Sequence, residues 1–398
     1  MYGRGDGVVG TVTNGNRTAI MDDYLDKLSP RERHLLASHN FDPAIFQKLR
    51  RRFCEGQWST ADNRITNKVE LAADGDIRPL PDAYSEEAQR LAEIGREALE
   101  KGEVGALVLN GGMATRFGSV VKGCVPVFDG YSFIGLKLAD AASRGPSVPV
   151  LLMNSFATDE KTREHLEKHN YFGFPPSKVT TFTQNISLRL TPEGELFEAI
   201  DDETLYAPGH GDVADALRRD VLDEFRARGG KYLLMSNVDN VLASLDPIVV
   251  GAHVAAAEAQ GVEMTIETVD NQGSTSGGMP ARVDGKLQVV EAFRFPEGFD
   301  VSAIPVYNTN TFMFTADALD QEFDLTWFVV EKTVQGKKAI QFERLAGQLS
   351  AFLKAQFLEV PRRGQESRFL PIKRREDLED NRDFLRRVAA PRVASLAL

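Results

Sequence analysis

Residues 107–118 read LVLNGGMATRFG, and this stretch decides the fold that the sequence predicts. Residues 106–109 are small or apolar, as expected of a short buried strand, and they run directly into a glycine turn. Gly111 and Gly112 lack a Cβ atom, so their backbone can approach a phosphate group closely and point successive N–H groups at its oxygens. The stretch therefore predicts a strand followed by a phosphate-binding loop.

Positive charge follows these glycines in the same loop, at Arg116 and Lys122. The loop matches neither of the two commonest nucleotide-binding patterns, because it lacks GxxxxGK[ST] and the third glycine of GxGxxG. The wrong glycine spacing also argues against a nicotinamide-dependent dehydrogenase. An ordinary turn between a strand and a helix, with a solvated arginine, is the alternative that this stretch alone leaves open.

The composition is that of an ordinary globular protein with two or three domains: 398 residues, 42% hydrophobic and 26% charged. The net charge of -11 argues against broad binding to nucleic acids or anionic membranes, so an anionic ligand needs a local basic pocket. The two cysteines, Cys54 and Cys124, favour a reducing compartment. No signal-peptide core or membrane-spanning run is present in the sequence, and we expect a cytoplasmic protein.

Predicted strands and helices alternate on both sides of the glycine loop. Strands are predicted at 148–153, 232–235, 263–268 and 310–314, and helices at 86–102, 159–169 and 212–228. The Asp-Gly pair at 284–285 predicts a hairpin with a type I′ turn. This alternation indicates an α/β fold with a mixed, mostly parallel sheet, helices on both faces and an antiparallel insertion. Toward the C-terminus we expect a helix over 339–353, a strand over 369–372 and a charged final helix.

Polar residues follow several predicted strands, and in open α/β sheets ligands bind beyond the carboxyl ends of the strands. They are Asn154 and Ser155, the run 236–240, the run 308–310, and Lys373. Amide, carbonyl and carboxylate groups at these places can bind sugar hydroxyls, and one carboxylate can hold Mg²⁺ between phosphates.

Asp239 is the best metal candidate, because Mg²⁺ on a nucleotide needs only one or two protein carboxylates. The alternative, that Asp239 caps the segment after it, carries equal weight. His210 lies between two glycines in PGHGD, where a structural role is more common than that of a general base. The sequence contains no His/Cys cluster with zinc spacing and no nucleophile-elbow pattern.

Seven motifs, taken together, resemble the UTP–glucose-1-phosphate uridylyltransferase (UDP-glucose pyrophosphorylase) family. They occur in family order over roughly residues 105–375, and they read LNGGMATRFG, MNSFATDEKT, PGHGDV, YLLMSNVDN, GGMPARVDGKLQVVE, YNTNTF and SRFLPIK. The UDP-N-acetylhexosamine pyrophosphorylases share the glycine loop but differ around the sugar-binding asparagines. The resemblance therefore implies a GT-A/Rossmann-like fold and the conversion of UTP and glucose 1-phosphate to UDP-glucose and pyrophosphate, with Mg²⁺.

The resemblance also implies roles for individual residues. UTP would be held by Leu109, Asn110, Gly111, Gly112, Gln184 and Gly209, the sugar phosphate by His210, Asn237, Asn308, Thr309 and Asn310, and Mg²⁺ by Asp239. Arg116, Lys122 and Lys373 would offset the charge of the reacting phosphates. Two departures concern the loop: Ala114 replaces a glycine, and Val127 follows Pro126 where the family has lysine. Lys122 can place an ammonium group in the same space.

Four parts are expected from this combined interpretation. Residues 1–18 form a flexible leader, 19–100 a helical N-terminal extension, 101–335 the nucleotidyltransferase domain, and 336–398 a short C-terminal segment that closes the active site. The chain ends soon after Lys373, so the C-terminal β-helix of the eukaryotic members is expected to be absent. Two alternatives remain open: the same reaction on another sugar 1-phosphate, such as N-acetylhexosamine or galactose 1-phosphate, and a nucleotide-sugar-binding sensor without turnover. The oligomeric state, monomer or dimer, is not indicated.

Overall fold

The computed structural model describes residue 24, residues 26–114 and residues 120–396. The expected flexible leader and Arg116 lie outside these residues. Among the described residues, no helix is both long enough and apolar enough to cross a membrane.

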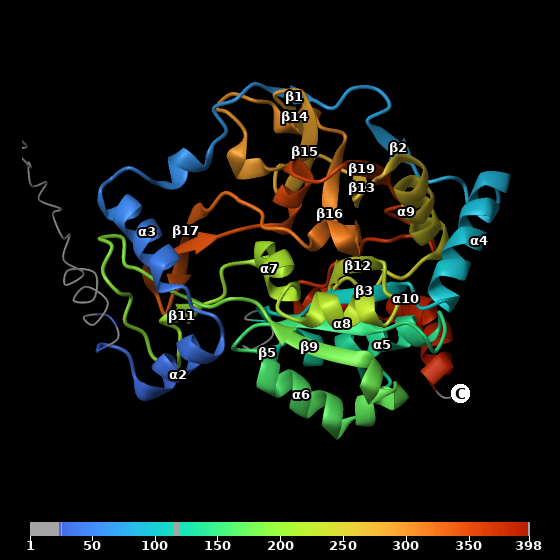
Figure 1. The fold of residues 1–398 in the computed structure, drawn as a ribbon, viewed down its shortest axis with the longest axis horizontal. Coiled ribbons are helices and arrows are strands. Elements are labelled where there is room, and N and C mark those ends of the chain that lie inside the picture. The colour runs from blue at the N-terminus through green and yellow to red at the C-terminus, as the bar shows by residue number, and fades with distance from the viewer. Residues whose placement is uncertain (1–23, 25, 115–119, 397–398) are drawn as a thin grey trace, which may run out of the picture.

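An eight-stranded sheet forms the centre of the molecule (Figure 1). From one edge to the other its strands are β2 (Ile77–Pro79), β19 (Ala355–Glu359), β13 (Met264–Asp270), β16 (Val306–Thr315), β12 (Tyr232–Asn237), β3 (Val104–Leu109), β8 (Val150–Asn154) and β9 (Val179–Thr183). β16 is antiparallel to both of its neighbours, and the other neighbouring pairs are parallel. The predicted mixed, mostly parallel α/β sheet is confirmed.

Helices cover both faces of this sheet, as predicted. One face packs against α4 (Glu86–Glu100), α5 (Phe133–Ala142), α6 (Asp159–Lys168), α9 (Pro247–Gln260) and α10 (Arg375–Val393). The other face packs against α7 (Val213–Leu217), α8 (Val221–Ala227) and the short 3-10 turn η10 (Ala346–Ala351). The apolar residues of β3 alternate between these two cores, Val108 in one and Leu107 in the other, as expected of a strand buried on both faces.

The helix α4 joins the N-terminal part of the chain to the central core. Its start follows the sequence signal, because the Ser85 side chain accepts a hydrogen bond from the backbone N–H of Ala88. α4 crosses α9 at Gly95 and Gly251, where a Cβ atom on Gly95 would lie 1.9 Å from the carbonyl oxygen of Pro247. The glycines therefore allow the two helix backbones to touch.

Two smaller parts extend from the central sheet (Figure 1). A three-stranded sheet consists of β1 (Val69–Leu71), β14 (Gly278–Val283) and β15 (Lys286–Glu291). A small lobe consists of α2 (Pro30–Ser38), α3 (Pro43–Cys54), the pair β10 (Ser187–Leu188) and β11 (Leu205–Tyr206), and the hairpin β17 (Phe328–Val334) and β18 (Lys337–Glu343). Two further short pairs are β4 (Met113–Ala114) with β5 (Val120–Val121) and β6 (Pro126–Phe128) with β7 (Tyr131–Ser132).

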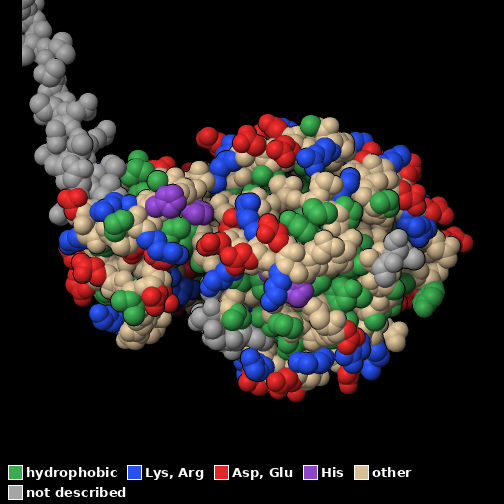
Figure 2. All heavy atoms as spheres, turned by 90° about the horizontal axis from the view of Figure 1, so that it is seen from below, with side chains coloured by type: hydrophobic (Ala, Val, Ile, Leu, Met, Phe, Trp, Pro, Cys, Tyr) green, Lys and Arg blue, Asp and Glu red, His purple; other side chains and the backbone are tan. Residues whose placement is uncertain are grey.

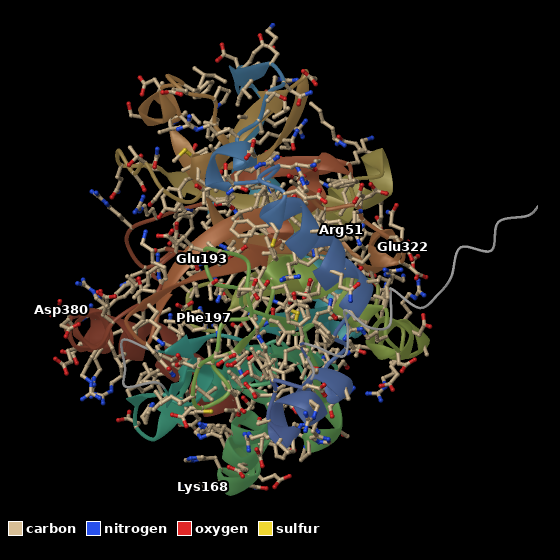
Figure 3. All side chains as sticks on the ribbon, turned by 90° about the vertical axis from the view of Figure 1, so that its left-hand side faces the viewer. Arg51, Lys168, Glu193, Phe197, Glu322 and Asp380 are labelled. Carbon is tan, nitrogen blue, oxygen red and sulfur yellow. The ribbon has the colours of Figure 1, made fainter. Side chains whose placement is uncertain are left out.

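The small lobe joins the N-terminal helices to a segment far along the chain. Figure 3 looks onto this lobe, with Arg51 on α3 and Glu193 and Phe197 on the segment that links β10 to β11. The Arg50 guanidinium donates a hydrogen bond to the Gly194 carbonyl at 2.8 Å. Trp58 stacks on Phe342 of β18 with 5.1 Å between ring centroids. The lobe therefore has its own apolar centre.

The hairpin predicted at the Asp-Gly pair is confirmed as β14 and β15. Asp284 and Gly285 have φ values of 48° and 82°, as a type I′ turn requires. The region 19–100 is not only helical, because it also contributes β1 to this hairpin sheet and β2 to the edge of the central sheet. The expected boundary at 335–336 falls in the turn between the paired strands β17 and β18.

Three predicted elements are wrong. The helix expected over 212–228 is two helices, because Asp220 adopts φ 88° and turns the chain between α7 and α8. The first part of the helix expected over 339–353 is the strand β18, whose Ile340 and Phe342 are buried in the apolar centre of the small lobe. Residues 369–372 form no strand, since the backbone N–H of Leu370 donates to the Asn240 side chain instead of to a strand.

Candidate functional site

A cavity of about 370 Å³ lies where the parallel strands β3 and β12 end. Its lining residues are Leu109, Gly111, Gly112, Lys122, Met153, Gln184, Ala207, Gly209, His210, Asn237, Val238 and Asp239. Most of the site residues expected from the sequence are among them. Figure 2 shows a groove between the small lobe and the main body, and acidic and basic side chains are interspersed around it.

The glycine loop presents backbone rather than side chains to the cavity. The Asn110 side chain is fully buried and points the other way, because its amide donates to Asn154 Oδ1 at 2.8 Å and to Thr162 Oγ1 at 2.9 Å. The Ser155 hydroxyl donates to the Gly111 carbonyl oxygen at 2.9 Å. Asn110 and Ser155 therefore tie the loop to β8 and α6, and Asn110 is not among the residues that line the cavity.

Gln184 lies directly against the glycine loop. A Cβ atom on Gly111 would lie 2.1 Å from Gln184 Nε2, so only glycine leaves room for this amide. Gln184 is 6% exposed, and its Oε1 atom has no hydrogen-bond partner within the part of the chain that is described. A buried acceptor without a partner is costly, so this oxygen is suited to an N–H donor from a ligand.

Lys122 and Asp239 form an ion pair inside the cavity. Asp239 follows β12 and is 7% exposed, and Lys122 reaches it from the far end of the glycine loop. The hydrogen bond found for the Asp239 carboxylate goes to Lys122 and not to the backbone after it, so the capping alternative is not supported. The pair places one anion and one cation in the cavity that Gly111 and Gly112 also line.

His210 is held in a defined tautomer by the chain opposite it. The backbone N–H of Ala346 donates to His210 Nδ1 at 3.0 Å, which leaves the proton of the neutral ring on Nε2. Desolvation in the cavity wall lowers the pKa of His210 to about 4. The ring is therefore a neutral hydrogen-bond donor near pH 7 and is poorly suited to accept a proton as a general base.

The loop that carries His210 is fixed by Arg344, which sequence reasoning did not single out. Gly209 has φ 97°, and a Cβ atom there would lie 2.5 Å from the Arg344 carbonyl oxygen. The Arg344 side chain forms ion pairs with Asp212 and Asp215, and its guanidinium carbon lies 4.4 Å from the centroid of the Trp327 ring. These ion pairs secure the tight turn, and a lone arginine within a predicted helix gave no signal of it.

The asparagines expected to bind the sugar phosphate lie inside β16 and not after its end. Because β16 is antiparallel, its beginning lies beside the carboxyl end of β12, and Asn310 Nδ2 donates to Asn237 Oδ1 at 3.0 Å. Thr309 points away from this place, since it is 2% exposed and donates to the Glu267 carbonyl oxygen. Asn237, Asn308 and Asn310 therefore remain candidates, and Thr309 has a role within the sheet.

Glu291, at the end of the hairpin strand β15, joins this polar group and was missed from the sequence. A Cβ atom on Gly278 would lie 2.9 Å from Glu291 Oε1 and 3.4 Å from Asn308 Nδ2, so both side chains meet over that glycine. Burial raises the pKa of Glu291 to about 7, and Arg294 opposes this shift. Only the tertiary structure reveals its neighbourhood, because the hairpin comes from another part of the chain.

Lys373 lies next in sequence to a residue that contacts Asp239. The backbone N–H of Ile372 donates to the Asp239 carbonyl oxygen at 3.2 Å, and the Lys373 side chain is exposed. The segment 360–374 thus brings Lys373 near the cavity without including it in the lining.

One carboxylate, Asp239, lines the cavity, and among the described residues no group of three or more His, Cys, Asp or Glu side chains is arranged to hold a metal ion. A single carboxylate suits Mg²⁺ carried by a nucleotide, because phosphate oxygens and water supply its other ligands. The residues present therefore fit a nucleotide-bound Mg²⁺ and not a metal held by the protein alone.

A model of the family described as UTP–glucose-1-phosphate uridylyltransferase matches residues 44–384. The chain is 30% identical over 293 residues to the enzyme of that name from Hordeum vulgare, a match that covers 68% of this chain and 60% of the barley protein. The chain thus spans about 60% of the length of this relative.

Two solved structures have a similar fold. The uridine diphosphate N-acetylglucosamine pyrophosphorylase from Trypanosoma brucei, solved with an inhibitor, has a TM-score of 0.73 and 20% identity, covering 94% of this chain and 82% of that chain. A UDP-glucose pyrophosphorylase variant from Leishmania major, in complex with UDP-glucose, has a TM-score of 0.67 and 21% identity, covering 92% and 79%. At these identities the likeness extends to the fold alone.

Proposed function

The chain belongs to the UTP–glucose-1-phosphate uridylyltransferase family, and from this premise we propose that it converts UTP and glucose 1-phosphate to UDP-glucose and pyrophosphate. One observation carries the proposal: the glycine loop, the Lys122–Asp239 ion pair and the neutral His210 line one cavity. The two cysteines of the chain, Cys54 and Cys124, are free thiols, which suit a reducing compartment such as the cytoplasm.

The uridine part of UTP would occupy the side of the cavity at Gln184. A primary amide offers both a donor and an acceptor, which complements the N–H and carbonyl groups of a uracil ring. The absence of a Cβ atom at Gly111 keeps that amide in place, and backbone N–H groups of Gly111 and Gly112 would hold phosphate oxygens.

The reaction would be an in-line displacement at the α-phosphorus of UTP. A phosphate oxygen of glucose 1-phosphate forms the new P–O bond, and the bond from the α-phosphorus to the bridging oxygen breaks, so pyrophosphate leaves with that electron pair. The attacking oxygen is already anionic and needs no general base. Positioning and neutralisation of charge therefore supply most of the rate enhancement.

Cations and hydrogen-bond donors of this chain would supply that neutralisation. Lys122 and Arg116 would offset charge on the reacting phosphates, and Lys373 would approach from the segment 360–374. His210 would donate Nε2–H to a phosphate or sugar oxygen, since its Nδ1 is occupied. Asp239 would bind Mg²⁺, which when present neutralises charge shared between the phosphates.

The sugar would lie toward Asn237, Asn308 and Asn310, with Glu291 beyond them. These amides are joined by the bond between Asn310 and Asn237, so their donors and acceptors are fixed relative to each other. A carboxyl group whose pKa is raised toward 7 can exchange hydrogen bonds with a sugar hydroxyl in either protonation state.

The test is pyrophosphate release from UTP and Mg²⁺ with a panel of sugar 1-phosphates. We expect kcat/KM for glucose 1-phosphate to exceed that for galactose 1-phosphate and N-acetylglucosamine 1-phosphate by about tenfold or more, because fixed hydrogen-bonding groups discriminate against a misplaced or added group. If another sugar 1-phosphate is preferred, the proposed reaction type stands but the proposed substrate is wrong. If UTP binds saturably but no pyrophosphate is released, the protein is a nucleotide-sugar sensor and not an enzyme of this class.

A further inference from the structure

The segment that carries Asp239 is buried although it forms neither helix nor strand. Residues 238–245 are all buried, and they follow β12 in a series of turns. Buried backbone groups outside regular structure need hydrogen-bond partners from other parts of the chain. The position of Asp239 therefore depends on whatever supplies those partners.

Lys137, on α5, supplies two of them and also binds the end of β12. Its ammonium donates to Ser236 Oγ at 2.9 Å, to the Asn240 carbonyl oxygen at 2.8 Å and to the Ala243 carbonyl oxygen at 2.8 Å. An ammonium group has three N–H donors, so all of them go to the end of β12 and the segment that follows it. Two of the three acceptors, Ser236 and Asn240, flank Asp239 in sequence.

A buried lysine is energetically costly, so the need to fill this space does not explain why the residue is a lysine. Lys137 is 4% exposed, and a buried ammonium loses several kcal/mol of hydration, whereas an apolar side chain would fill the same space without that loss. Asp140, one turn further along α5, provides partial compensation by its charge. Asp140 also accepts from the backbone N–H of Leu245 at 2.8 Å, so α5 holds the segment at both ends.

The other side of the segment is tied to the chain near the C-terminus. The Asn240 side chain donates to the Arg368 carbonyl oxygen at 3.1 Å and accepts from the backbone N–H of Leu370 at 3.0 Å. Arg368 in turn forms a buried ion pair with Glu267. With Lys137 removed, the turn would keep this second anchor, so it would shift and loosen but would not unfold the protein.

We propose that Lys137 is a positioning residue, which fixes the turn that presents Asp239 to the nucleotide and its metal ion. The expected effect on metal binding rests on the proposed function. The effect on the order of residues 238–243 does not depend on it. Lys137 is not among the residues that line the cavity.

The first test compares Lys137→Met with Asp140→Asn. Met keeps the length and much of the packing of the lysine but donates no hydrogen bond, and Asp140→Asn weakens an anchor on the same helix that contacts Leu245 instead of the turn at Asp239. We expect the dissociation constant of Mn²⁺ in the presence of UTP, measured by electron paramagnetic resonance, to rise about tenfold or more in Lys137→Met. Asp140→Asn removes part of the charge compensation but keeps Lys137 and its three acceptors, so this constant should rise by about threefold or less, and metal-free UTP binding should stay within about threefold in both variants. Equal weakening of metal binding in the two variants would overturn the proposal.

Hydrogen exchange provides a readout that does not depend on the proposed function. We expect amides of residues 238–243 to exchange about tenfold faster or more in Lys137→Met, while β3 and β12 keep their protection. Unchanged exchange in folded Lys137→Met would overturn the proposal. If the wild-type protein binds neither UTP nor Mn²⁺ but the turn still loosens, the proposed function fails and the positioning role stands. Should Lys137→Met not fold, Ser236→Ala removes one of the three acceptors, and the absence of faster exchange in the turn would count against the proposal.

Discussion

The central sheet has a hollow at each of its two ends, and only one of them has the properties of a binding site. The hollow at the amino ends of β3, β8 and β9 has a volume of about 190 Å³ and is lined by three cations, Lys101, Lys178 and Arg228. The hollow at the carboxyl ends has a volume of about 370 Å³ and contains one lysine, several glycines and His210. By charge alone the first is the better candidate for an anionic ligand.

The difference lies in which polar groups already have partners. Lys101 pairs with Glu97 at 2.6 Å, Lys178 Nζ lies 3.5 Å from the Ser147 carbonyl oxygen, and Arg228 donates to the Ser177 carbonyl oxygen at 3.4 Å. At the carboxyl end Lys122 is also paired, with Asp239, but Gln184 Oε1 has no partner within the described chain. A ligand therefore gains new hydrogen bonds at one end and would have to replace existing ones at the other.

The largest effect on turnover is expected from substitutions in the Lys122–Asp239 pair of the carboxyl-end hollow. We expect Asp239→Asn to lower kcat on the order of 10³-fold and Lys122→Ala on the order of 10²-fold, because each removes a charge that neutralises the phosphates or binds their metal ion. Steady-state release of pyrophosphate measures both, with thermal unfolding as a control for folding. Near-normal kcat in either variant would remove that residue from the reaction.

The carboxyl-end hollow should also make the protein sensitive to acid. The folded-state pKa of His210 is lowered to about 4 from an ordinary value of 6.5, so the unfolded chain binds more protons between these values. Stability is therefore lost as the pH falls through this range, and we expect about 2 kcal/mol less from this residue at pH 5 than at pH 7. Urea unfolding at the two pH values measures this loss, and His210→Gln should reduce it. An equal loss in both proteins would assign the acid sensitivity to other groups.

A smaller effect is expected when the glycine loop is filled. Gly111→Ala places a methyl group where Gln184 Nε2 lies, and the flexible Gln184 side chain can move aside at little cost in stability. We therefore expect KM for UTP to rise about tenfold with unfolding temperature almost unchanged. Gln184→Ala and the double variant complete a thermodynamic cycle. If Gly111→Ala acts through Gln184, the double variant should bind UTP no worse than Gln184→Ala, and additive losses would show that it acts elsewhere.

The smallest effect is expected at the amino-end hollow. Because Lys101 and Lys178 already have partners, the double variant Lys101→Ala/Lys178→Ala should change kcat and KM for UTP by less than about twofold. The same assay as above measures this. A loss of tenfold or more would mean that this hollow takes part in binding, and it would invalidate the rule drawn from the comparison.

Sequence reasoning succeeded where local pattern and chemistry agree. The strand before Asn110 is apolar on both faces, Ser85 caps α4, and the Asp284-Gly285 turn has the backbone that its residues favour. These features are set by neighbours in sequence. Placing polar residues after the strands also singled out Asn237 and Asp239, which lie in the cavity lining because parallel strands bring their carboxyl ends to one edge. Gln184 and Gly209, which line the same cavity, were expected only from the family resemblance.

It failed where distant contacts override the local pattern. Ile340 and Phe342 lie in a stretch that suits a helix, but pairing with β17 and burial in the small lobe make it a strand. Thr309 was grouped with its asparagine neighbours, and the alternation of side chains along β16 turns it to the other side.

Local patterns in the sequence are enough to predict the α/β class, the glycine loop and polar groups after the strands, because strand period and turn chemistry depend on neighbouring residues. Three contacts are visible only in the folded molecule: Lys122 pairs with Asp239, Ala346 donates to His210, and Lys137 donates to the turn at Asn240. Each of these contacts joins residues more than 100 positions apart. Such pairs follow from how the helices and strands pack together, which no stretch of sequence specifies alone.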